Sequence, residues 1–472
     1  MRIAIVGAGV AGLAAAYELE LARQQGAAID YDVYESSARV GGVLSSRMED
    51  GTVLEHGPDS FLTEKPAAVA LCRELGLEDQ LLGSDDAQRR TFILVGRKLV
   101  PLPDGLMFLV PTRLLPTITT PLFDPLTKLR MGLEWFQRAR RGGQDESVAS
   151  LVRRHYGQVA VDRLADPLLS GIYGGDAEQL SAQSVLPAMV RLERDYGSLT
   201  RGMLAARRKQ QAAARQSAGK PRHTLFTTLR GGLQQLVNAL EARLDPQRLH
   251  LGARADLLSL DAGGWRLRFQ DHPTERMDAV ILATPAWAAA RLLREVHGPM
   301  SQELAGIPYS SSITVNLLFD EQQIPPLPPG FGFLVPAVEG RAMLACTFVH
   351  RKFPGRTAAG RAVLRCFAGG MRGESMMEES DDAIVQRMRD DLQEILGITH
   401  APLLAEVRRW PRSMAQYSVG HADRIERIHR YTAALPRLHL AGNAYDGIGI
   451  SDCIRLGRGA AEALLQAGVR SE

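Results

Sequence analysis

Cysteine is scarce in this sequence of 472 residues, and its four copies form no recognisable motif. Cys72, Cys346, Cys366 and Cys453 lack the close spacing along the chain that a zinc site or a redox dithiol requires. No uncharged apolar run reaches the roughly 18 residues of a membrane-spanning helix. We therefore expect a cytoplasmic protein without a metal site and without a membrane span.

Neither sign of charge is in large excess, because 56 basic and 53 acidic side chains leave a formal net charge of only +3. This balance gives no global field that would favour nucleic acid as a partner. Hydrophobic residues make up 45% and charged residues 23% of the chain, as in ordinary globular proteins. The length is about three times that of a usual domain, so two or three domains are expected.

The amino-terminal segment has the pattern strand, glycine turn, helix. Residues 3–6 form a short apolar run typical of a strand buried on both faces of a parallel sheet, and residues 13–19 are rich in helix formers. The turn between them consists of Gly7, Ala8, Gly9, Val10, Ala11 and Gly12. Gly7 would permit the tight turn, Gly9 would let a pyrophosphate approach the backbone, and Gly12 would let the helix pack closely on the strand.

A second strand is expected at residues 31–35, and it ends in an acid. Glu35 is suited to bind the hydroxyl pair of a ribose. The alternative is a glycine turn followed by a solvated glutamate. Because strand, helix, second strand and acid follow one another in this order, we interpret the segment as a dinucleotide site, for either nicotinamide or flavin.

The next segment favours flavin. Arg39 could pair with pyrophosphate oxygens, or be an ordinary surface arginine, and the turn at Gly41 and Gly42 lets the chain pass close to a dinucleotide. Gly57 and Pro58 form another tight turn within reach of the cofactor. Together these segments resemble the amino-terminal signature of the amine oxidase and porphyrinogen oxidase superfamily of flavin enzymes. The resemblance implies FAD, and since no cysteine or histidine stands out as an attachment point, we expect it to be noncovalent.

Two later segments of the chain are expected to contact the same cofactor. Residues 279–285 predict a buried strand ended by proline, after a hairpin around residues 263–264. The superfamily resemblance implies that this strand closes the dinucleotide domain and that Leu257 offers backbone groups to the adenine. Sequence alone identifies both segments only as strands.

Near the carboxyl end, residues 438–443 predict a further buried strand, followed by a glycine-containing turn and a helical run over 453–465. Ser451 or Asp452 could cap this helix, while Gly447 and Gly449 leave space for a flat ring. A helix amino terminus aimed at the flavin would stabilise the negative charge that appears on reduction. The cofactor residues expected here are Gly442, Gly449, Ile450 and Ser451.

The middle of the chain differs in character, since three stretches between residues 126 and 169 have helical spacing. Residues 106–123 are apolar but broken by proline, which indicates either core or a patch lying on a membrane surface. A basic stretch without any acid follows, containing Arg201, Arg207, Arg208, Lys209, Arg215, Lys220, Arg222 and Arg230. It could be a solvated helix face and loop, or a docking surface for acidic lipid or for a partner enzyme such as ferrochelatase.

Three segments, residues 170–176, 330–336 and 443–449, resemble the heme-biosynthetic protoporphyrinogen oxidases, and with the flavin motifs the resemblance covers essentially the whole chain. Residues 91–123 look most like the bacterial branch that oxidises coproporphyrinogen III. The expected fold class is therefore α/β and α+β. We predict an FAD-binding Rossmann-like domain from the discontinuous segments 1–85, 222–300 and 418–472, a helical insertion at 86–221 and a mixed-sheet substrate domain at 301–417.

The resemblance implies a porphyrinogen that loses six electrons in three hydride transfers to FAD, with molecular oxygen as the final acceptor. The protein would supply orientation, an apolar slot and electrostatics, so we nominate no catalytic acid–base residue. Leu334 and Phe367 match family positions that sandwich the tetrapyrrole, although a plain core role is the alternative for both. Thr347 is the third such position, where an aliphatic residue is common.

Further substrate positions also follow from the resemblance. Asp59 stands near the reacting centre, where asparagine is frequent, and the peptide around Gly174 and Gly175 lies close to the reacting methylene. Thr91 replaces an arginine that binds propionate in plant enzymes. Arg90 just before it, with Arg89, Arg97 and Lys98, suggests a basic mouth that would also accept coproporphyrinogen III.

Two alternatives remain open. An amine oxidase is disfavoured because residues 307–319 contain no lysine and because Gly449 falls where an aromatic residue is expected. The second alternative is a flavoprotein that binds heme precursors without oxidising them.

Overall fold

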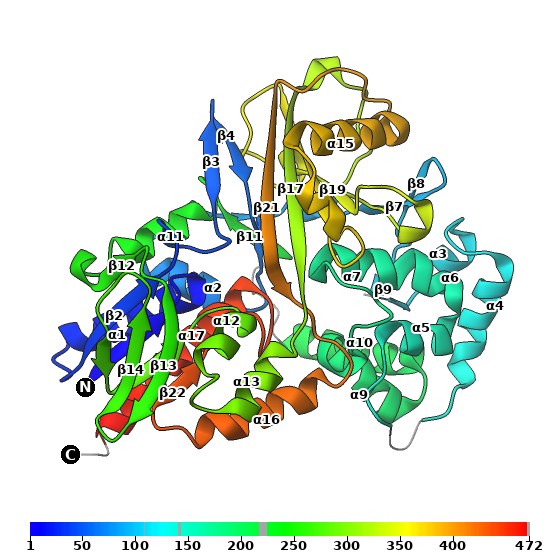
Figure 1. Ribbon diagram of the computed structural model, residues 1–472. Coiled ribbons are helices and arrows are strands. Elements are labelled where there is room, and N and C mark those ends of the chain that lie inside the picture. Colours follow the sequence, from blue (N-terminus) through cyan, green and yellow to red (C-terminus); the bar gives the residue numbers. More distant parts are fainter. Residues whose placement is uncertain (108, 140–142, 217–223, 470–472) are drawn as a thin grey trace.

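The amino-terminal strand lies in the middle of a five-stranded parallel sheet with the order β12-β2-β1-β16-β22 in the computed structural model (Figure 1). The model describes residues 1–107, 109–139, 143–216 and 224–469. The strands are β1 (Arg2–Val6), β2 (Asp30–Glu35), β12 (Leu249–Leu251), β16 (Ala279–Leu282) and β22 (Leu438–Leu440). This sheet confirms the predicted α/β class and its assembly from distant segments.

Alternation along β1 explains why both faces of this sheet are covered. Ile3 and Ile5 point into a core shared with the helices α1 (Val10–Gln24), α2 (Pro66–Glu74), α11 (Gln234–Glu241) and α17 (Ile450–Val469). Ala4 and Val6 point to the opposite core, beneath a three-stranded antiparallel sheet. That sheet contains β13 (Ala255–Asp261), β14 (Gly264–Phe269) and β15 (Glu275–Met277), so the predicted hairpin is present. The same side holds α12 (Ala286–Leu292), α13 (Gly298–Ala305) and α16 (His421–Ala433).

A seven-stranded mixed sheet forms the second region, in the order β21-β17-β20-β19-β18-β7-β8. Its strands are β7 (Thr91–Val95), β8 (Lys98–Pro101), β17 (Tyr309–Asp320), β18 (Gly332–Leu334), β19 (Ala345–Phe348), β20 (Arg361–Gly369) and β21 (Leu404–Ala415). One face packs on α15 (Asp381–Leu396). Because β7 pairs in parallel with β18, residues 91–101 belong to this sheet and not to the helical insertion that was predicted to begin at residue 86.

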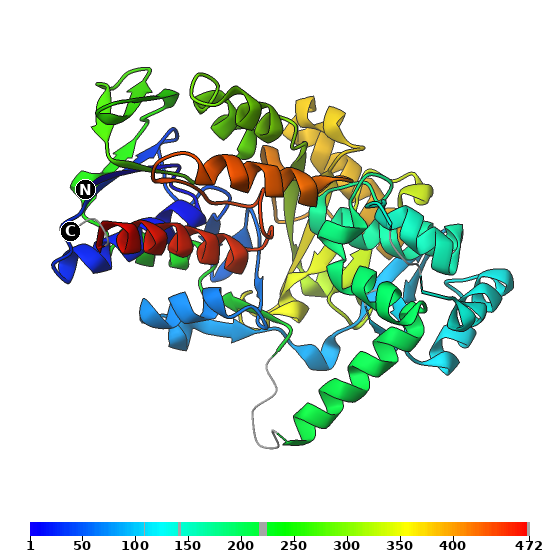
Figure 2. The ribbon, with the colours of Figure 1, turned by 90° about the horizontal axis from the view of Figure 1, so that it is seen from below.

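The helical unit, residues 114–216, lies at the lower right in Figure 1, beneath the part of the sheet that contains β7 and β8. It contains α3 (Leu114–Thr119), α4 (Pro125–Leu133), α5 (Val148–Tyr156), α6 (Gln158–Ala160), α7 (Asp166–Tyr173), α8 (Ala182–Val185), α9 (Pro187–Tyr196) and α10 (Leu199–Gln216). The predicted helices at 126–140, 147–156 and 159–169 are thus largely confirmed. Figure 2 shows α10 extending away from the rest of the chain.

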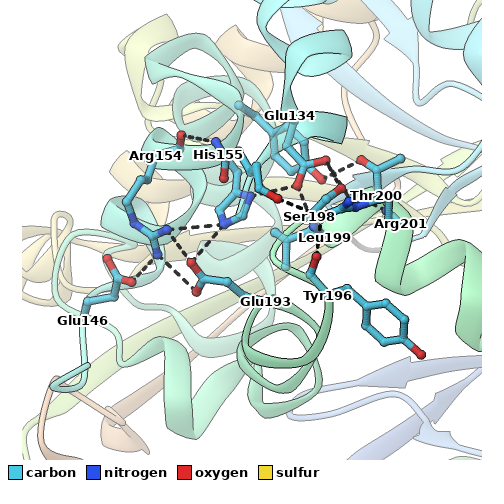
Figure 3. Close-up of polar contacts among 12 residues, drawn as sticks. Glu134, Glu146, Arg154, His155, Glu193, Tyr196, Ser198, Leu199, Thr200 and Arg201 are labelled. Atoms are coloured by element: carbon cyan, nitrogen blue, oxygen red, sulfur yellow. Dashed lines mark hydrogen bonds and ion pairs between the residues drawn. The ribbon is translucent and has the colours of Figure 1, made fainter. Parts of the chain in front are cut away.

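A buried polar network joins the helices of this unit (Figure 3). The Glu134 carboxylate accepts from His155 Nδ1 at 2.9 Å and from the Leu199 backbone N–H at 2.6 Å, at the amino terminus of α10. His155 Nε2 lies 3.4 Å from Glu193, which also pairs with Arg154. Burial alone would lower the pKa of His155, but the two glutamates raise it above its ordinary value. The network therefore fixes α5, α9 and α10 to one another.

Smaller elements complete the fold: β3 (Ser46–Glu49), β4 (Thr52–Glu55), β5 (Phe61–Leu62), β6 (Leu81–Gly83), β9 (Leu106–Met107), β10 (Val110–Pro111), β11 (Phe226–Leu229) and α14 (Val349–Lys352). Lys220, Arg222 and the expected boundary between residues 221 and 222 lie outside the described residues. No helix within the described part of the chain is long and apolar enough to cross a membrane.

Candidate functional site

A cavity of about 1380 Å³ lies between the seven-stranded sheet, the helical unit and the loop that follows β22. One wall is the exposed face of the seven-stranded sheet, and a second wall comes from α7 and α8. The remaining walls are the turn at residues 57–62, helix α16 and the loop 443–452 that leads into α17. The cavity thus brings together segments from both ends and the middle of the chain.

Alternation along the strands explains the composition of the sheet wall. Thr91, Leu334, Thr347 and Phe367 stand on neighbouring strands and all line the cavity. The residues between them, such as Phe333 and Cys366, point to the opposite face and join the core with α15. The four positions proposed from the sequence as substrate contacts are therefore neighbours on one face.

Asp59 enters the cavity floor from the turn after β4 and is held by two cations. Lys352 Nζ lies 3.0 Å from its Oδ2, and Arg365 Nη1 lies 3.6 Å from the same oxygen. Arg365 also donates to the carbonyl of Gly57 and packs over the Phe367 ring at 4.6 Å. Asp59 is thereby fixed between the turn and the sheet.

The ion pairs keep Asp59 charged in spite of its burial. Burial alone would raise the pKa of this carboxyl, but Lys352, Arg365 and the Ser60 hydroxyl together lower it well below its ordinary range. Burial lowers the pKa of Lys352 and of Arg365, and Asp59 opposes both shifts. The floor beside Phe367 therefore carries one buried carboxylate between two buried cations.

A second buried ion pair lies beneath the first. The guanidinium of Arg356 is completely buried and donates to Glu55, which also accepts from the Leu233 backbone N–H at 2.9 Å. Burial raises the pKa of Glu55, while Arg356 acts in the opposite direction. Arg356 also donates to the Thr228 hydroxyl at 3.2 Å. These contacts tie β4 and β11 to the segment after α14.

The loop before α17 closes the opposite side of the cavity. Tyr417 donates to the carbonyl of Asn443 and accepts from the Gly447 backbone N–H, both at 3.0 Å. Asp452 accepts from the Gly449 N–H at 3.2 Å and from Lys65 Nζ at 2.6 Å. Gly449, Ile450 and Ser451 line the cavity here, at the amino terminus of α17 as the sequence predicts.

The first glycine turn fits a dinucleotide. A Cβ atom on Gly7 would lie 2.7 Å from the carbonyl oxygen of Ala283, and one on Gly12 would lie 1.9 Å from that of Gly7. A Cβ atom on Gly9 would meet nothing within 4 Å. Two glycines are therefore required by the fold itself, whereas Gly9 leaves open space at the amino terminus of α1. This space is where a pyrophosphate would lie.

The residues around this turn are close together. Glu35 accepts from the Ala8 N–H at 2.8 Å, and Gly9 bridges to Gly41. A Cβ atom on Gly42 would lie 3.2 Å from Gly9 Cα. Arg39 curls over this loop and donates to the carbonyls of Val40, Gly42 and Leu44. Leu257, which is expected from the resemblance to contact the adenine, lies at a bulge of β13, where the strand pairing is irregular.

Some of the remaining site residues expected from the sequence line the cavity, and the others lie outside its walls. Gly57, Pro58 and Gly174 line the cavity. Gly174 ends α7 with a φ of +57°, and its carbonyl accepts from the Met371 N–H at 3.0 Å. Gly175, Ala11 and Gly442 lie outside the cavity walls, as do the exposed Arg90, which precedes β7, and Arg97 and Lys98 at the turn between β7 and β8. The basic mouth expected from those residues is not part of the cavity lining.

Sequence reasoning missed several cavity residues, namely Lys65, Lys352, Arg365, Tyr417 and His421. A signal existed for Arg365, because it interrupts the apolar run of β20 that follows Arg361. None existed for Lys352 or His421, which reach the cavity only through long-range packing. The two lysines also qualify the argument against amine oxidation, since the cavity does contain lysine, supplied from segments other than 307–319.

The glycine turn, the parallel sheet and the cavity at a second helix amino terminus define a flavin-dependent oxidoreductase. The family model described as flavin containing amine oxidoreductase matches residues 10–465, and the chain belongs to this family. It is 34% identical to coproporphyrinogen III oxidase of Bacillus subtilis over 97% of each chain. It is 26% identical to protoporphyrinogen oxidase 2 of Arabidopsis thaliana, over 98% of this chain and 94% of that one.

A solved structure gives a similar result. A protein from Exiguobacterium sp. 255-15, provisionally described as a protoporphyrinogen oxidase, superposes with a TM-score of 0.86 at 32% identity and covers 99% of each chain. The cyclohexylamine oxidase of Brevibacterium oxydans has a TM-score of 0.70 at 16% identity. The second likeness concerns the fold alone.

Proposed function

We propose that this chain oxidises a porphyrinogen to a porphyrin with noncovalently bound FAD and molecular oxygen. The observation that carries the proposal is the position of the cavity. Its sheet wall with Leu334 and Phe367 faces the loop 443–452 at the amino terminus of α17. FAD, when bound, would accept hydride, and Gly9, Glu35, Gly41 and Gly449 would hold it. The walls would orient the macrocycle and exclude water.

We further propose coproporphyrinogen III as the preferred substrate. The relatives named coproporphyrinogen III oxidase are 30–34% identical to this chain, and those named protoporphyrinogen oxidase are 26–28% identical. Arg430 and His429 of α16 line the cavity and are exposed, so this opening can meet propionates in water. A carboxylate that stays hydrated avoids the penalty of burial without a partner.

The test is a side-by-side rate measurement on coproporphyrinogen III and protoporphyrinogen IX, with oxygen uptake and porphyrin fluorescence as readouts. We expect turnover of both and a higher kcat/KM for coproporphyrinogen III. Putrescine and cyclohexylamine serve as amine controls. Turnover of an amine alone would favour an amine oxidase, and flavin that stays oxidised in anaerobic mixtures with either porphyrinogen would favour a binding protein without oxidase activity.

We also propose that the helical unit contacts an anionic membrane surface. Leu126, Leu129 and Leu133 follow one face of α4 and are more than half exposed, and Phe136 just beyond them is 75% exposed. Exposed apolar groups of this size are unusual unless they serve an interaction. Since α10 packs against the segment that carries Phe136, its exposed cations Arg208 and Lys209 belong to the same unit. Apolar insertion and cationic attraction together are typical of interfacial binding.

Flotation with vesicles tests this surface. We expect the protein to float with phosphatidylglycerol vesicles, to float less with phosphatidylcholine alone, and to lose flotation in the variant Leu126→Glu/Leu129→Glu. The variant Val338→Glu, also at an exposed apolar side chain but outside the helical unit, is the control. Absence of flotation would leave a partner enzyme such as ferrochelatase as the occupant and would refute the lipid proposal.

A further inference from the structure

His421 is a buried side chain of the central cavity whose hydrogen-bonding capacity is unused. It is the first residue of α16, and only 3% of its surface is exposed. It lines the cavity, and neither ring nitrogen has a hydrogen-bond partner among the described residues. The hydroxyl of Tyr445, in the same wall, is also buried without a partner. Buried polar groups in folded proteins nearly always have partners. The ring nitrogens of His421 and the hydroxyl of Tyr445 therefore indicate a ligand in the cavity.

The imidazole is held firmly even though neither ring nitrogen forms a well-aligned hydrogen bond within the described residues. It stacks on Tyr417 with 4.1 Å between ring centroids and an angle of 13° between the ring planes. Tyr417 is fixed in turn by its two hydrogen bonds to the loop 443–452. The helix start is also anchored, because the Gly420 N–H donates to Asp145 at 2.8 Å. His421 is thus positioned relative to the expected flavin loop.

The surroundings keep this imidazole neutral. Burial lowers its pKa to about 4, and Arg424 on the same helix acts in the same direction. Asp446 and the backbone at Ala444 and Tyr445 oppose the shift. Tyr417 faces the ring from the other side. A neutral imidazole carries one nitrogen that can accept a proton or a hydrogen bond.

The other titratable groups of the cavity are less suited to accept a proton. Asp59 is engaged by Lys352 and Arg365, and Asp452 by Lys65. Two further groups lie at the exposed end of α16. There His429 pairs with Asp446 at 3.3 Å, and Glu426 is exposed to solvent.

We propose that His421 accepts the proton that leaves the porphyrinogen at each two-electron step. The inference rests on the proposed function. In each step a methylene C–H bond breaks and its electron pair leaves as hydride to the flavin. A second bond to hydrogen breaks as well, a pyrrole N–H in two of the three steps and a C–H of the fourth methylene in the other, and its electron pair remains in the macrocycle to form the new double bond. His421 takes that proton and releases it to water along the exposed face of α16. This role revises the expectation that no side chain exchanges protons with the substrate.

The test compares His421→Gln, which retains polarity without a basic ring nitrogen, and His421→Phe, which retains the stack on Tyr417. Flavin reduction by coproporphyrinogen III is followed anaerobically by stopped flow. General base catalysis contributes typically 10²–10⁴-fold, so we expect both variants to be slower by about 100-fold or more. FAD content and the Kd for coproporphyrin III should stay within about 3-fold. The control is His350→Gln, since His350 also lacks hydrogen-bond partners among the described residues but lines a different hollow.

The pH profile and chemical rescue provide a readout that a structural role would not change. The wild-type rate should fall as pH decreases through the pKa of His421, because a protonated imidazole cannot accept. This decrease of the flavin reduction rate at low pH should be absent from both variants. Added imidazole should accelerate His421→Gly. Flavin reduction within about 3-fold of wild type in both variants would overturn the inference, as would loss of FAD from both. Failure of the wild type to reduce its flavin with any porphyrinogen would instead refute the proposed function.

Discussion

Lys352 Nζ lies 3.0 and 3.1 Å from the two carboxylate oxygens of Asp59, although 293 residues separate the two positions along the chain. The pair connects the turn after β4 to α14, and Lys352 also packs over the Phe226 ring at 4.6 Å. Both side chains line the central cavity. A charged pair in this position stabilises the site only while both members are present.

Removal of one member should therefore be costly. We expect Lys352→Met to lower the free energy of unfolding by about 1.5–3 kcal/mol, because the Asp59 carboxylate loses its hydrogen bonds to Nζ but keeps Arg365 as a counter-charge. Asp59→Asn should cost more, about 3–5 kcal/mol, because it leaves Lys352 and Arg365 buried without the carboxylate between them. The double variant should cost less than the sum of the two single losses, because Lys352→Met removes one of the two cations that Asp59→Asn leaves unpaired, and urea unfolding of all four proteins can measure this. Additive losses would contradict this coupling.

The two glycines of the first turn should respond differently to the same substitution. Gly9→Val should fold and lose FAD, because its side chain would fill the open space at the start of α1. Gly12→Val should fail to fold, since a Cβ atom there would lie 1.9 Å from a backbone oxygen. Flavin absorbance and circular dichroism separate the two outcomes. Stoichiometric FAD in Gly9→Val would refute the proposed pyrophosphate site.

Glu35 should contribute directly to cofactor affinity. Its carboxylate also accepts from the backbone of Ala8 and Ser37, so it is oriented before FAD binds. Glu35→Ala should weaken FAD binding by about 1.5–3 kcal/mol through loss of a charged acceptor, measured by fluorescence titration of the apoprotein. Glu18→Ala, which removes the ion pair of α1 with Arg458 of α17, is the control, and equal affinity in both variants would argue against a ribose contact.

His155 should make the stability of the helical unit dependent on pH. The pKa of His155 is raised in the folded state, so its contribution to the free energy of unfolding is complete below about pH 6.5. That contribution is lost as pH rises through the raised pKa of the folded state. His155→Gln should cost about 3–5 kcal/mol at pH 6, because Glu134 would lose the charge of the imidazolium while Glu193 keeps Arg154, and the difference from wild type should shrink at higher pH. Urea unfolding measures this, and His272→Gln, at an exposed histidine outside the helical unit, is the control.

Substrate selectivity should depend on the cations at the cavity opening. Arg430→Glu should raise KM more for the tetrapropionate coproporphyrinogen III than for the dipropionate protoporphyrinogen IX. Arg90→Glu/Arg97→Glu, the pair suggested by the sequence, should show the same bias only if propionates reach the exposed β7 and β8 hairpin. A bias confined to the hairpin variant would assign recognition to residues 89–98 and would contradict a role of Arg430.

Local patterns were sufficient for the elements nearest the cofactor. The glycine turn and the strand ending at Glu35 follow from short-range rules, and so does the helix after Gly449. The pairing of distant strands is not a local property, so the sequence could not reveal that Thr91 stands beside Gly332. The same limit applies to the cysteines, because Cys346 and Cys366 are 20 residues apart but their sulfur atoms lie 4.0 Å from each other. Ion pairs such as Asp59 with Lys352 appear only once these pairings exist.

The discontinuous parallel sheet has a consequence for biosynthesis. Helix α1 packs against α17, whose Gly457 backbone approaches that of Ala11, and β16 pairs with β22. At roughly 5–20 residues per second, a ribosome needs roughly 20–90 s to proceed from α1 to α17. During this interval the nascent chain presents an apolar helix face and an unpaired strand edge. The cofactor site can therefore close only after α17 has been synthesised, and until then the nascent chain is a natural client for chaperones.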